Sequence, residues 1–295
     1  MKVQASIDLG TNTCLLLVRE NPPEKILHDE SQVVRLGQGV DRTGELAPEA
    51  MGRAFQCLKE YVRVAQSFGV QPSHILAVGT AQARDAKNAN SFFTRIEREL
   101  GIRFKVLSGD EEAAATFRGA ALPGMDIQKM VVMDIGGGST EIVSFTGGES
   151  LSLGAVRMTE RYLKSDPCTD QEFWTCESAI DDLLSTRKAW RESLQAPEFV
   201  AVAGTAVTLA MLNESIPQYD RARLEGVVIT KGDAHRLVEE LKWRSVEERK
   251  KMVGMEPKRA DVILAGALIF WRTMEVLDFN EAKISTRGLR FGVLD

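Results

Sequence analysis

The chain of 295 residues has no stretch of apolar residues approaching the ~20 needed to span a membrane. Its first residues, MKVQASIDLG, also lack the order of basic, apolar and small residues that defines a secretory signal. Aromatic residues are scarce, at 6% of the chain, but 44% of the residues are hydrophobic. We therefore expect a globular, cytoplasmic protein with a sizeable core and no membrane partner.

Residues typical of metal centres and redox sites are few. Four cysteines, at positions 14, 57, 168 and 176, match neither a zinc site nor a redox CxxC pair, and buried reduced thiols are the favoured interpretation. The three histidines lie far apart in the sequence, so none is nominated for catalysis. The net charge of −5 with mixed signs predicts no general attraction to nucleic acid.

Common phosphate-binding motifs are absent as well. The sequence contains no GK[ST], which excludes a P-loop, and its glycine-rich turns are followed by strand-like residues rather than by the helix of a Rossmann turn. What it has instead is one design used twice. VQASIDLGTNTCLLLV begins at Val3 and KMVVMDIGGGSTEIVSF at Lys129, with Asp8 and Asp134 at matching places.

Each copy reads as an apolar strand that ends in aspartate, a turn rich in glycine and hydroxyl residues, and a second strand. Glycine lets the main chain approach an anion closely, so such a turn offers backbone N–H groups to phosphate and its aspartate to a metal. A lone copy is equally well explained as an ordinary hairpin, whereas a matched pair favours two turns that together hold a phosphate chain.

The pattern along the chain predicts two α/β domains, as the length also suggests at ~150 residues per domain. We expect an N-terminal lobe at 1–123 and a C-terminal lobe at 124–295, whose last residues either end the second lobe or return to the first. Strands are predicted at 2–8, 14–20, 24–29, 32–36, 74–79 and 104–107, then at 130–144, 150–154, 199–203 and 281–285. Helices are predicted at 48–68, 91–100, 156–163, 170–189, 205–212, 231–242, 245–252 and 260–277. Ser108 and Glu111 have the spacing of a capping box, and an alanine-rich helix is predicted after them.

A strand-and-hairpin unit used twice is the arrangement of actin, Hsp70 and the sugar kinases. The fold class expected is two ribonuclease-H-like lobes around a central cleft. Four segments then resemble the Ppx/GppA phosphatase family, the exopolyphosphatases and guanosine pentaphosphate phosphatases: IDLGTNTCLLLV, GTAQARDAKNANSF, LSGDEEAAATFRGA and DIGGGSTEIV. The resemblance continues to STRGLRFGVL and so covers nearly the whole chain.

The resemblance implies magnesium-dependent removal of the terminal phosphate from inorganic polyphosphate or from pppGpp. Glu112 matches the catalytic glutamate and would deprotonate the attacking water, although it would also suit a helix N-terminus. Glu141 would hold magnesium or the water, and Arg84 would bind phosphate oxygens unless Asp85 ties it down. Asp134 and Asp8 would hold the metal, unless they only accept N–H bonds from their own turns. Stimulation by potassium is left open.

Phosphate contacts are expected largely through backbone N–H groups of both turns and of a third corner that follows a strand. The expected phosphate-binding residues are Gly10, Thr11, Asn12, Thr13, Gly136, Gly137, Gly138, Ser139, Gly204 and Thr205. Ala203 stands where the family often has another glycine, a departure that bears on nucleotide recognition more than on hydrolysis.

Three other functions remain open on the sequence alone. The hairpin pair is shared with actin-like ATPases and sugar kinases, and a non-catalytic polyphosphate or alarmone sensor is the third reading. Retention of both glutamates argues against a sensor, because they would repel a bound polyanion without a metal or water to serve. The resemblance also implies a homodimer and, without the HD-type third domain of longer relatives, a preference for shorter polyphosphate.

Overall fold

The computed structural model describes residues 2–22, 24–122, 124–192 and 197–295. Its contacts divide the chain into two compact units. Unit 1 comprises Met1–Gly119 together with Leu289–Asp295, and unit 2 comprises Ala120–Gly288. The expected boundary at 123/124 lies a few residues later, and Pro123, expected to break the chain there, lies outside the described residues.

Unit 1 is built on a five-stranded sheet in the order β3-β2-β1-β4-β5. The strands are β1 (Lys2–Leu9), β2 (Thr13–Asn21), β3 (Lys25–Val33), β4 (Leu76–Gly79) and β5 (Phe104–Val106). Antiparallel pairs join β1 to β2 and β2 to β3, and parallel pairs join β1 to β4 and β4 to β5. The helices are α1 (Val40–Thr43), α2 (Pro48–Ser67), α3 (Ala81–Asp85), α4 (Ala89–Leu100), α5 (Gly109–Ala120) and α14 (Leu289–Gly292), with a short 3₁₀ turn at Pro72–His74.

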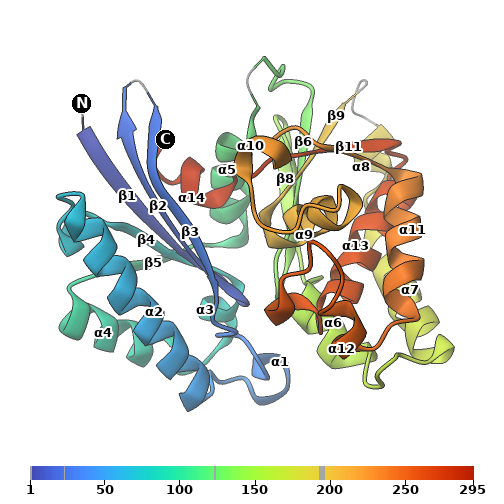
Figure 1. Ribbon diagram of the computed structural model, residues 1–295, viewed down its shortest axis with the longest axis horizontal. Coiled ribbons are helices and arrows are strands. Elements are labelled where there is room, and N and C mark those ends of the chain that lie inside the picture. Colours follow the sequence, from blue (N-terminus) through green and yellow to red (C-terminus); the bar gives the residue numbers. More distant parts are fainter. Residues whose placement is uncertain (1, 23, 123, 193–196) are drawn as a thin grey trace. The chain divides into compact units, whose positions relative to one another are not determined.

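Alternation along the strands sorts unit 1 side chains between two faces. Ile7 and Leu9 of β1 join the core under α2 and α4, with Leu58 and Tyr61 of α2 in the same cluster. Their neighbours, including Asp8, therefore point to the other face. That is the face on which α14 lies against β1 and β2 (Figure 1).

The last residues of the chain are tied to unit 1 by buried polar contacts. The Arg290 guanidinium donates two hydrogen bonds to the Asp29 carboxylate on β3, at 2.8 and 2.9 Å. Arg19, 1% exposed, donates to the Asp295 carboxylate at 2.8 Å. The Ser6 hydroxyl donates to the Arg290 carbonyl at 2.6 Å. Both arginines are buried, and their ion pairs join distant parts of the sequence.

Unit 2 has a six-stranded sheet in the order β10-β11-β9-β6-β7-β8. Read from β8, its first five strands repeat the connectivity of unit 1: an antiparallel meander of three, then parallel neighbours. The strands are β6 (Met130–Ile135), β7 (Thr140–Ser144), β8 (Gly147–Leu151), β9 (Glu198–Val202), β10 (Val228–Thr230) and β11 (Glu281–Ile284). This repeated order confirms the predicted fold class of two ribonuclease-H-like units.

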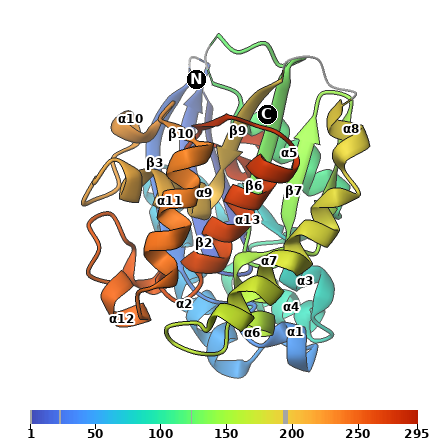
Figure 2. The same cartoon turned by 90° about the vertical axis from the view of Figure 1, so that its right-hand side faces the viewer.

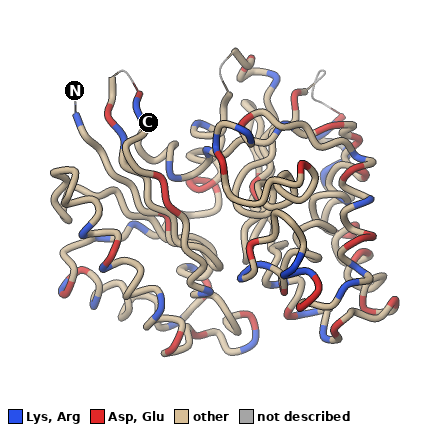
Figure 3. Tube along the Cα trace, viewed as in Figure 1, with Lys and Arg blue, Asp and Glu red and all other residues tan. Residues whose placement is uncertain are grey.

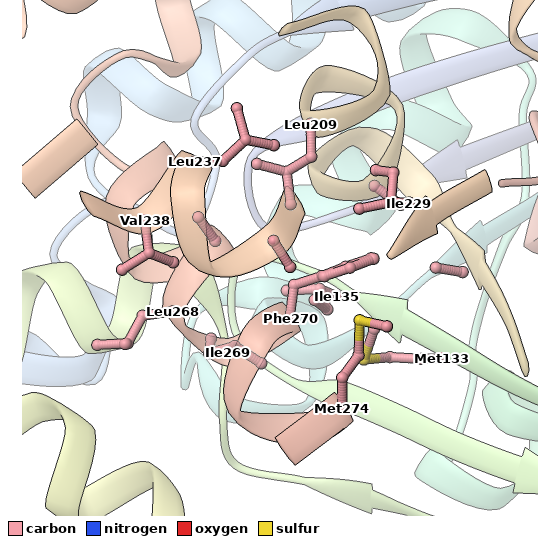
Figure 4. Packing of buried hydrophobic residues seen from close by; sticks show 14 of the residues in the cluster. Met133, Ile135, Leu209, Ile229, Leu237, Val238, Leu268, Ile269, Phe270 and Met274 are labelled. Carbon is pink, nitrogen blue, oxygen red and sulfur yellow. The ribbon is translucent and has the colours of Figure 1, made fainter. Parts of the chain in front are cut away.

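The helices of unit 2 form its core with one face of the sheet. They are α6 (Ala155–Tyr162), α7 (Asp170–Ser185), α8 (Lys188–Glu192), α9 (Ala203–Asn213), α10 (Arg221–Leu224), α11 (Lys231–Lys242), α12 (Val246–Arg249) and α13 (Ile263–Val276), with a 3₁₀ turn at Pro257–Arg259. The apolar helix α13 contacts both α7 and α11 (Figure 2). Figure 4 shows Phe270 and Met274 of α13 packed with Met133 and Ile135 of β6.

Several predicted elements need correction. One strand, β3 at Lys25–Val33, stands where two were predicted at 24–29 and 32–36, and its register against β2 runs from Val33 to Lys25 with a single irregularity. The polar residues Asp29 and Glu30 lie within this strand, since an edge strand tolerates polar side chains and Asp29 binds Arg290. The helix predicted at 170–189 is interrupted after Ser185, and the four- and five-residue helices were too short to show a period.

All four cysteines are free, and Cys14, Cys57 and Cys176 are buried. Burial raises the pKa of Cys14 and raises that of Cys176 to about 12, which keeps these thiols protonated. No helix among the described residues is long and apolar enough to cross a membrane. Lys and Arg lie among Asp and Glu along α11, whereas the charged residues of α7 are all acidic (Figure 3).

Candidate active site

The two repeated turns have the same geometry. Loop 1 (residues 10–13) joins β1 to β2, and the Gly10 N–H donates to the Thr13 carbonyl at 2.8 Å. Loop 2 (residues 136–139) joins β6 to β7, and the Gly136 N–H donates to the Ser139 carbonyl at 2.9 Å. A Cβ on either glycine would lie 3.1 Å from that same carbonyl oxygen, so glycine permits the tight turn.

The carbonyl groups of loop 1 are held by the segment that follows β3. The Thr11 carbonyl accepts from the Gly37 N–H at 2.8 Å, and the Asn12 carbonyl accepts from the N–H groups of Val34 and Arg35, both at 2.9 Å. A Cβ on Gly37 would overlap the Thr11 methyl group. The close approach that makes these bonds therefore depends on glycine at 37.

The carbonyl groups of loop 2 are held by the first turn of α6. The carbonyls of Gly136 and Gly137 accept from the N–H groups of residues 155–157, at 2.9 to 3.0 Å. The Arg157 Nε donates to the Gly138 carbonyl at 2.8 Å. Gly154 begins this turn, and a Cβ there would overlap the loop 2 backbone. The first N–H groups of α6 are thereby satisfied by loop 2.

Because the C=O and N–H of one peptide point in opposite directions, holding the carbonyls turns the N–H groups the other way. Within the described residues, the backbone N–H groups of Asn12, Gly137, Gly138 and Ser139 have no acceptor. The Asn12 side chain is 7% exposed, and its Nδ2 also has no partner there. Buried donors without acceptors are costly, so both loops are suited to bind an anion.

Gly204 and Thr205 lie at the corner between β9 and α9. A Cβ on Gly204 would overlap the Arg259 guanidinium, whose pKa burial lowers to about 10 and which is therefore charged at neutral pH. The Thr205 hydroxyl donates to the Ile135 carbonyl at 3.1 Å, directly before loop 2. Ala203, at the start of this corner, has φ of +66°, a left-handed conformation that explains why glycine suits the position.

Arg84 and Glu112 form an ion pair in unit 1. Arg84 is on α3 and Glu112 in the first turn of α5, and Nη1 of Arg84 lies 2.7 Å from Oε2 of Glu112. The same Nη1 donates to the Leu107 carbonyl at 2.8 Å. Burial raises the pKa of Glu112, although the Arg84 hydrogen bond and charge oppose the rise. A carboxylate with a raised pKa is a better proton acceptor.

The neighbouring Glu111 has a structural task. Its carboxylate accepts from the Ser108 N–H at 2.9 Å and its own N–H donates to the Ser108 hydroxyl at 3.2 Å, which is the predicted capping box. Lys105 lies 2.7 Å from the same carboxylate and lowers its pKa. Since Glu111 caps the helix, Glu112 is not needed for that purpose.

Two carboxylates lie side by side in unit 2. Asp134 on β6 and Glu141 on β7 are directly paired in register, so their side chains share one face of the sheet. Glu141 is 1% exposed, and its Oε1 accepts from the Ser150 hydroxyl on β8 at 2.6 Å. In unit 1 the partner of Asp8 is Leu15, which offers no second carboxylate. Asp8 itself is buried, at 8% exposed.

No group of three or more His, Cys, Asp or Glu side chains that could hold a metal occurs in the described part of the chain. Asp134 and Glu141 offer oxygen ligands from two side chains instead. Magnesium usually binds protein through one or two carboxylates and completes its shell with water and phosphate. The donor set of unit 2 therefore fits magnesium better than a metal that needs a full protein cage.

Several residues that shape the loops were missed from the sequence. Ser150, Gly37 and Gly154 lie outside the four segments that carry the resemblance, and Gln82 lies in one of them but was given no role. Their contacts join parts of the chain that only folding brings together. Arg157 was not nominated for the site from the sequence either. For Gly154, the one usable signal was its place directly before a predicted helix.

The chain is thus an α/β protein of two ribonuclease-H-like units, each carrying the same hairpin loop. The profile of the Ppx/GppA phosphatase family matches residues 17–295, and the chain belongs to that family.

Relatives of known name agree with this assignment. Exopolyphosphatase 2 of Mycobacterium tuberculosis is 36% identical over 281 residues, covering 90% of this chain and 88% of that protein. The bifunctional 3-dehydroquinate synthase/phosphatase of Fusobacterium nucleatum is 29% identical, over 94% of this chain and 43% of its own length.

Solved structures show the same fold. The Aquifex aeolicus member of the Ppx/GppA family is 32% identical, with a TM-score of 0.81 over 99% of this chain and 97% of its own. An exopolyphosphatase from Cytophaga hutchinsonii is 28% identical, with a TM-score of 0.90 over 99% and 96% of the two chains.

Proposed function

We propose that this protein is an exopolyphosphatase that releases terminal orthophosphate from inorganic polyphosphate. The observation that carries the proposal is the pair of loops whose carbonyls are tied back and in which the N–H groups of Asn12, Gly137, Gly138 and Ser139 have no acceptor among the described residues. A polyanion of repeating phosphates supplies acceptors for such donors. The similarity to exopolyphosphatases of M. tuberculosis and C. hutchinsonii supports this substrate class.

In the proposed reaction a water attacks the terminal phosphorus in line, the bond to the bridging oxygen breaks, and orthophosphate leaves with a chain shorter by one phosphate. Glu112 orients this water and accepts its proton. Arg84 engages Oε2 of Glu112, which leaves Oε1 to accept the proton. The Arg84 guanidinium keeps further N–H groups for oxygens of the transferred phosphoryl group.

Asp134 and Glu141 would hold magnesium, with Asp8 in an indirect role through the first loop. Bound magnesium would neutralise charge on the phosphate oxygens. Ser150 fixes the Glu141 carboxylate by its 2.6 Å hydrogen bond, as a supporting residue does for a metal ligand. Stimulation by potassium and a homodimer stay predictions.

The alarmone pppGpp is the second candidate substrate. It presents the same terminal phosphoanhydride, and the family contains phosphatases of both kinds. Ala203, which stands where the family often has glycine and has a left-handed φ of +66°, is the feature that bears on this choice. The proposal of exopolyphosphatase activity also includes a preference for shorter polyphosphate over long chains.

The test is release of orthophosphate from short polyphosphate, long polyphosphate and pppGpp, with magnesium and without any phosphoryl acceptor. Wild type and Glu112→Gln are compared. We expect release from polyphosphate by wild type only. Release that requires an added acceptor would indicate a kinase, binding of polyphosphate without release would indicate a sensor, and faster release from pppGpp would indicate the alarmone phosphatase.

A further inference from the structure

Each loop is preceded by a carbonyl that a buried side chain holds. The Leu9 carbonyl, just before Gly10, accepts from Nε2 of Gln82 at 2.7 Å. The Ile135 carbonyl, just before Gly136, accepts from the Thr205 hydroxyl at 3.1 Å. Leu9 and Ile135 occupy the same place in the two repeats, between aspartate and glycine.

The two donors also occupy matching places in the fold. Strand β4 ends at Gly79 and lies parallel to β1, whereas β9 ends at Val202 and lies parallel to β6. Gln82 and Thr205 are each the third residue after the end of that strand. The same bond is therefore made at the same topological position by two chemically different side chains.

Both donor side chains are buried and closely surrounded by other residues. Gln82 is 2% exposed, and its Oε1 accepts from the Thr11 hydroxyl at 3.0 Å, so that hydroxyl proton is not available to an anion. Thr205 is 5% exposed, and a Cβ on Gly266 of α13 would lie 2.7 Å from its Cγ2. Glycine at 266 makes room for Thr205 to reach Ile135.

We infer that Gln82 and Thr205 are positioning residues, one for each loop. By fixing the peptide that enters the loop, each keeps the N–H groups of its loop turned away from the tied carbonyls. The sequence predicted a direct phosphate contact for Thr205. We assign it instead an indirect role, in which it acts on phosphate through loop 2. The inference rests on the proposed function, because it assumes that the loops bind phosphate.

The test uses Gln82→Met and Thr205→Val, which keep the approximate shape and remove the donor. Binding of tripolyphosphate with magnesium is measured by titration calorimetry in a Glu112→Gln background, so that no turnover interferes. We expect about tenfold weaker binding for each variant, the loss that one misplaced hydrogen-bonded loop would cause. In the active background, KM for polyphosphate should rise by a similar factor while kcat changes less.

Conservative variants and controls separate positioning from stability. Thr205→Ser keeps the hydroxyl and should bind as the parent does, whereas Gln82→Glu places a charged oxygen against the Leu9 carbonyl and should bind less well than Gln82→Met. Asn88→Leu is a matched control, because Asn88 bonds the Leu46 backbone at 2.8 and 3.0 Å away from the loops. It should unfold at lower temperature and bind normally.

The proposal is overturned if Gln82→Met and Thr205→Val lose stability as Asn88→Leu does and yet bind tripolyphosphate as tightly as the parent. It is also overturned if the parent itself binds none. That second result, with no phosphate release by wild type, would overturn the proposed function as well, so the two failures are distinguishable.

Discussion

The two units repeat one hairpin but differ in what surrounds it. In unit 1 the residue opposite the aspartate is Leu15, and the acidic residue with a raised pKa, Glu112, comes from a helix and is paired with Arg84. In unit 2 the residue opposite the aspartate is Glu141, held by Ser150. Under the proposed function, the shared hairpin would serve anion binding, and the differences would assign proton transfer to unit 1 and metal binding to unit 2.

The carbonyl groups of both loops are held mainly by backbone N–H groups, but different segments supply those groups in the two units. Unit 1 ties its carbonyls with an irregular segment after β3, and unit 2 with the first turn of α6. In each case one glycine, Gly37 or Gly154, permits the approach. What the two units have in common is the direction of the N–H groups rather than the residues that impose it.

Glu112→Gln should have the largest effect on activity, because it removes the proton acceptor that unit 2 does not duplicate. We expect kcat to fall about a thousandfold. Rates of phosphate release measure it, with Glu111→Gln as the matched control that alters the capping box and the ion pair with Lys105. Equal losses for both variants would refute a special role for Glu112.

Glu112→Gln should also change how the stability of the protein depends on pH. Burial raises the pKa of Glu112 in the folded state, so its stabilising contribution is complete below the unfolded pKa and is lost as the pH rises through the folded pKa. Glu112→Gln lacks this loss. Denaturant unfolding at several pH values should show a smaller decrease in stability with rising pH than in wild type, and an unchanged slope would contradict the raised pKa.

Arg84→Ala should reduce kcat/KM about a hundredfold by removing a phosphate ligand. It also removes the hydrogen bond and charge that lower the pKa of Glu112, so the acid limb of the pH profile should move to higher pH. Arg84→Lys keeps the charge and should move the limb less. A profile that stays in place while activity falls would mean that Arg84 does not act on Glu112.

Glu141→Leu makes unit 2 resemble unit 1 at the position opposite the aspartate. If Glu141 holds magnesium, the variant should need about ten- to a hundredfold more magnesium for half-maximal activity. Ser150→Ala should have a smaller effect in the same direction, since it frees the carboxylate without removing it. Unchanged magnesium dependence in Glu141→Leu would show that the metal binds elsewhere.

Ala203→Gly should have the smallest effect of these variants, and it should stabilise the protein rather than impair it. The corresponding corner of unit 1 begins at Thr80 with φ of −116°, whereas Ala203 is left-handed at +66°. Relief of that conformation should raise the free energy of unfolding by about 0.5–1 kcal/mol. Asp278→Gly is the control, because aspartate tolerates its φ of +54° better and should gain less on replacement. A loss of stability in Ala203→Gly would contradict this account.

The sequence predicted the hairpins, the order of the main elements and the capping box at Ser108, because each depends on local patterns. It could not predict that Gln82 and Thr205 hold matching carbonyls, since these bonds join residues 70 or more positions apart. The single strand β3 was misread for a similar reason. The polar Asp29 lies within this strand, and its partner Arg290 comes from near the end of the chain.

The most direct test of the central claim is an NMR titration of the amide-labelled protein with a non-hydrolysable imido analogue of tripolyphosphate. The account predicts that the amide signals of Asn12, Gly137, Gly138 and Ser139 shift to lower field as their N–H groups gain acceptors, while those of Gly10 and Gly136, already bonded within the loops, shift little. Binding of the analogue that leaves all four open amides unmoved would show that the loops do not hold the phosphates.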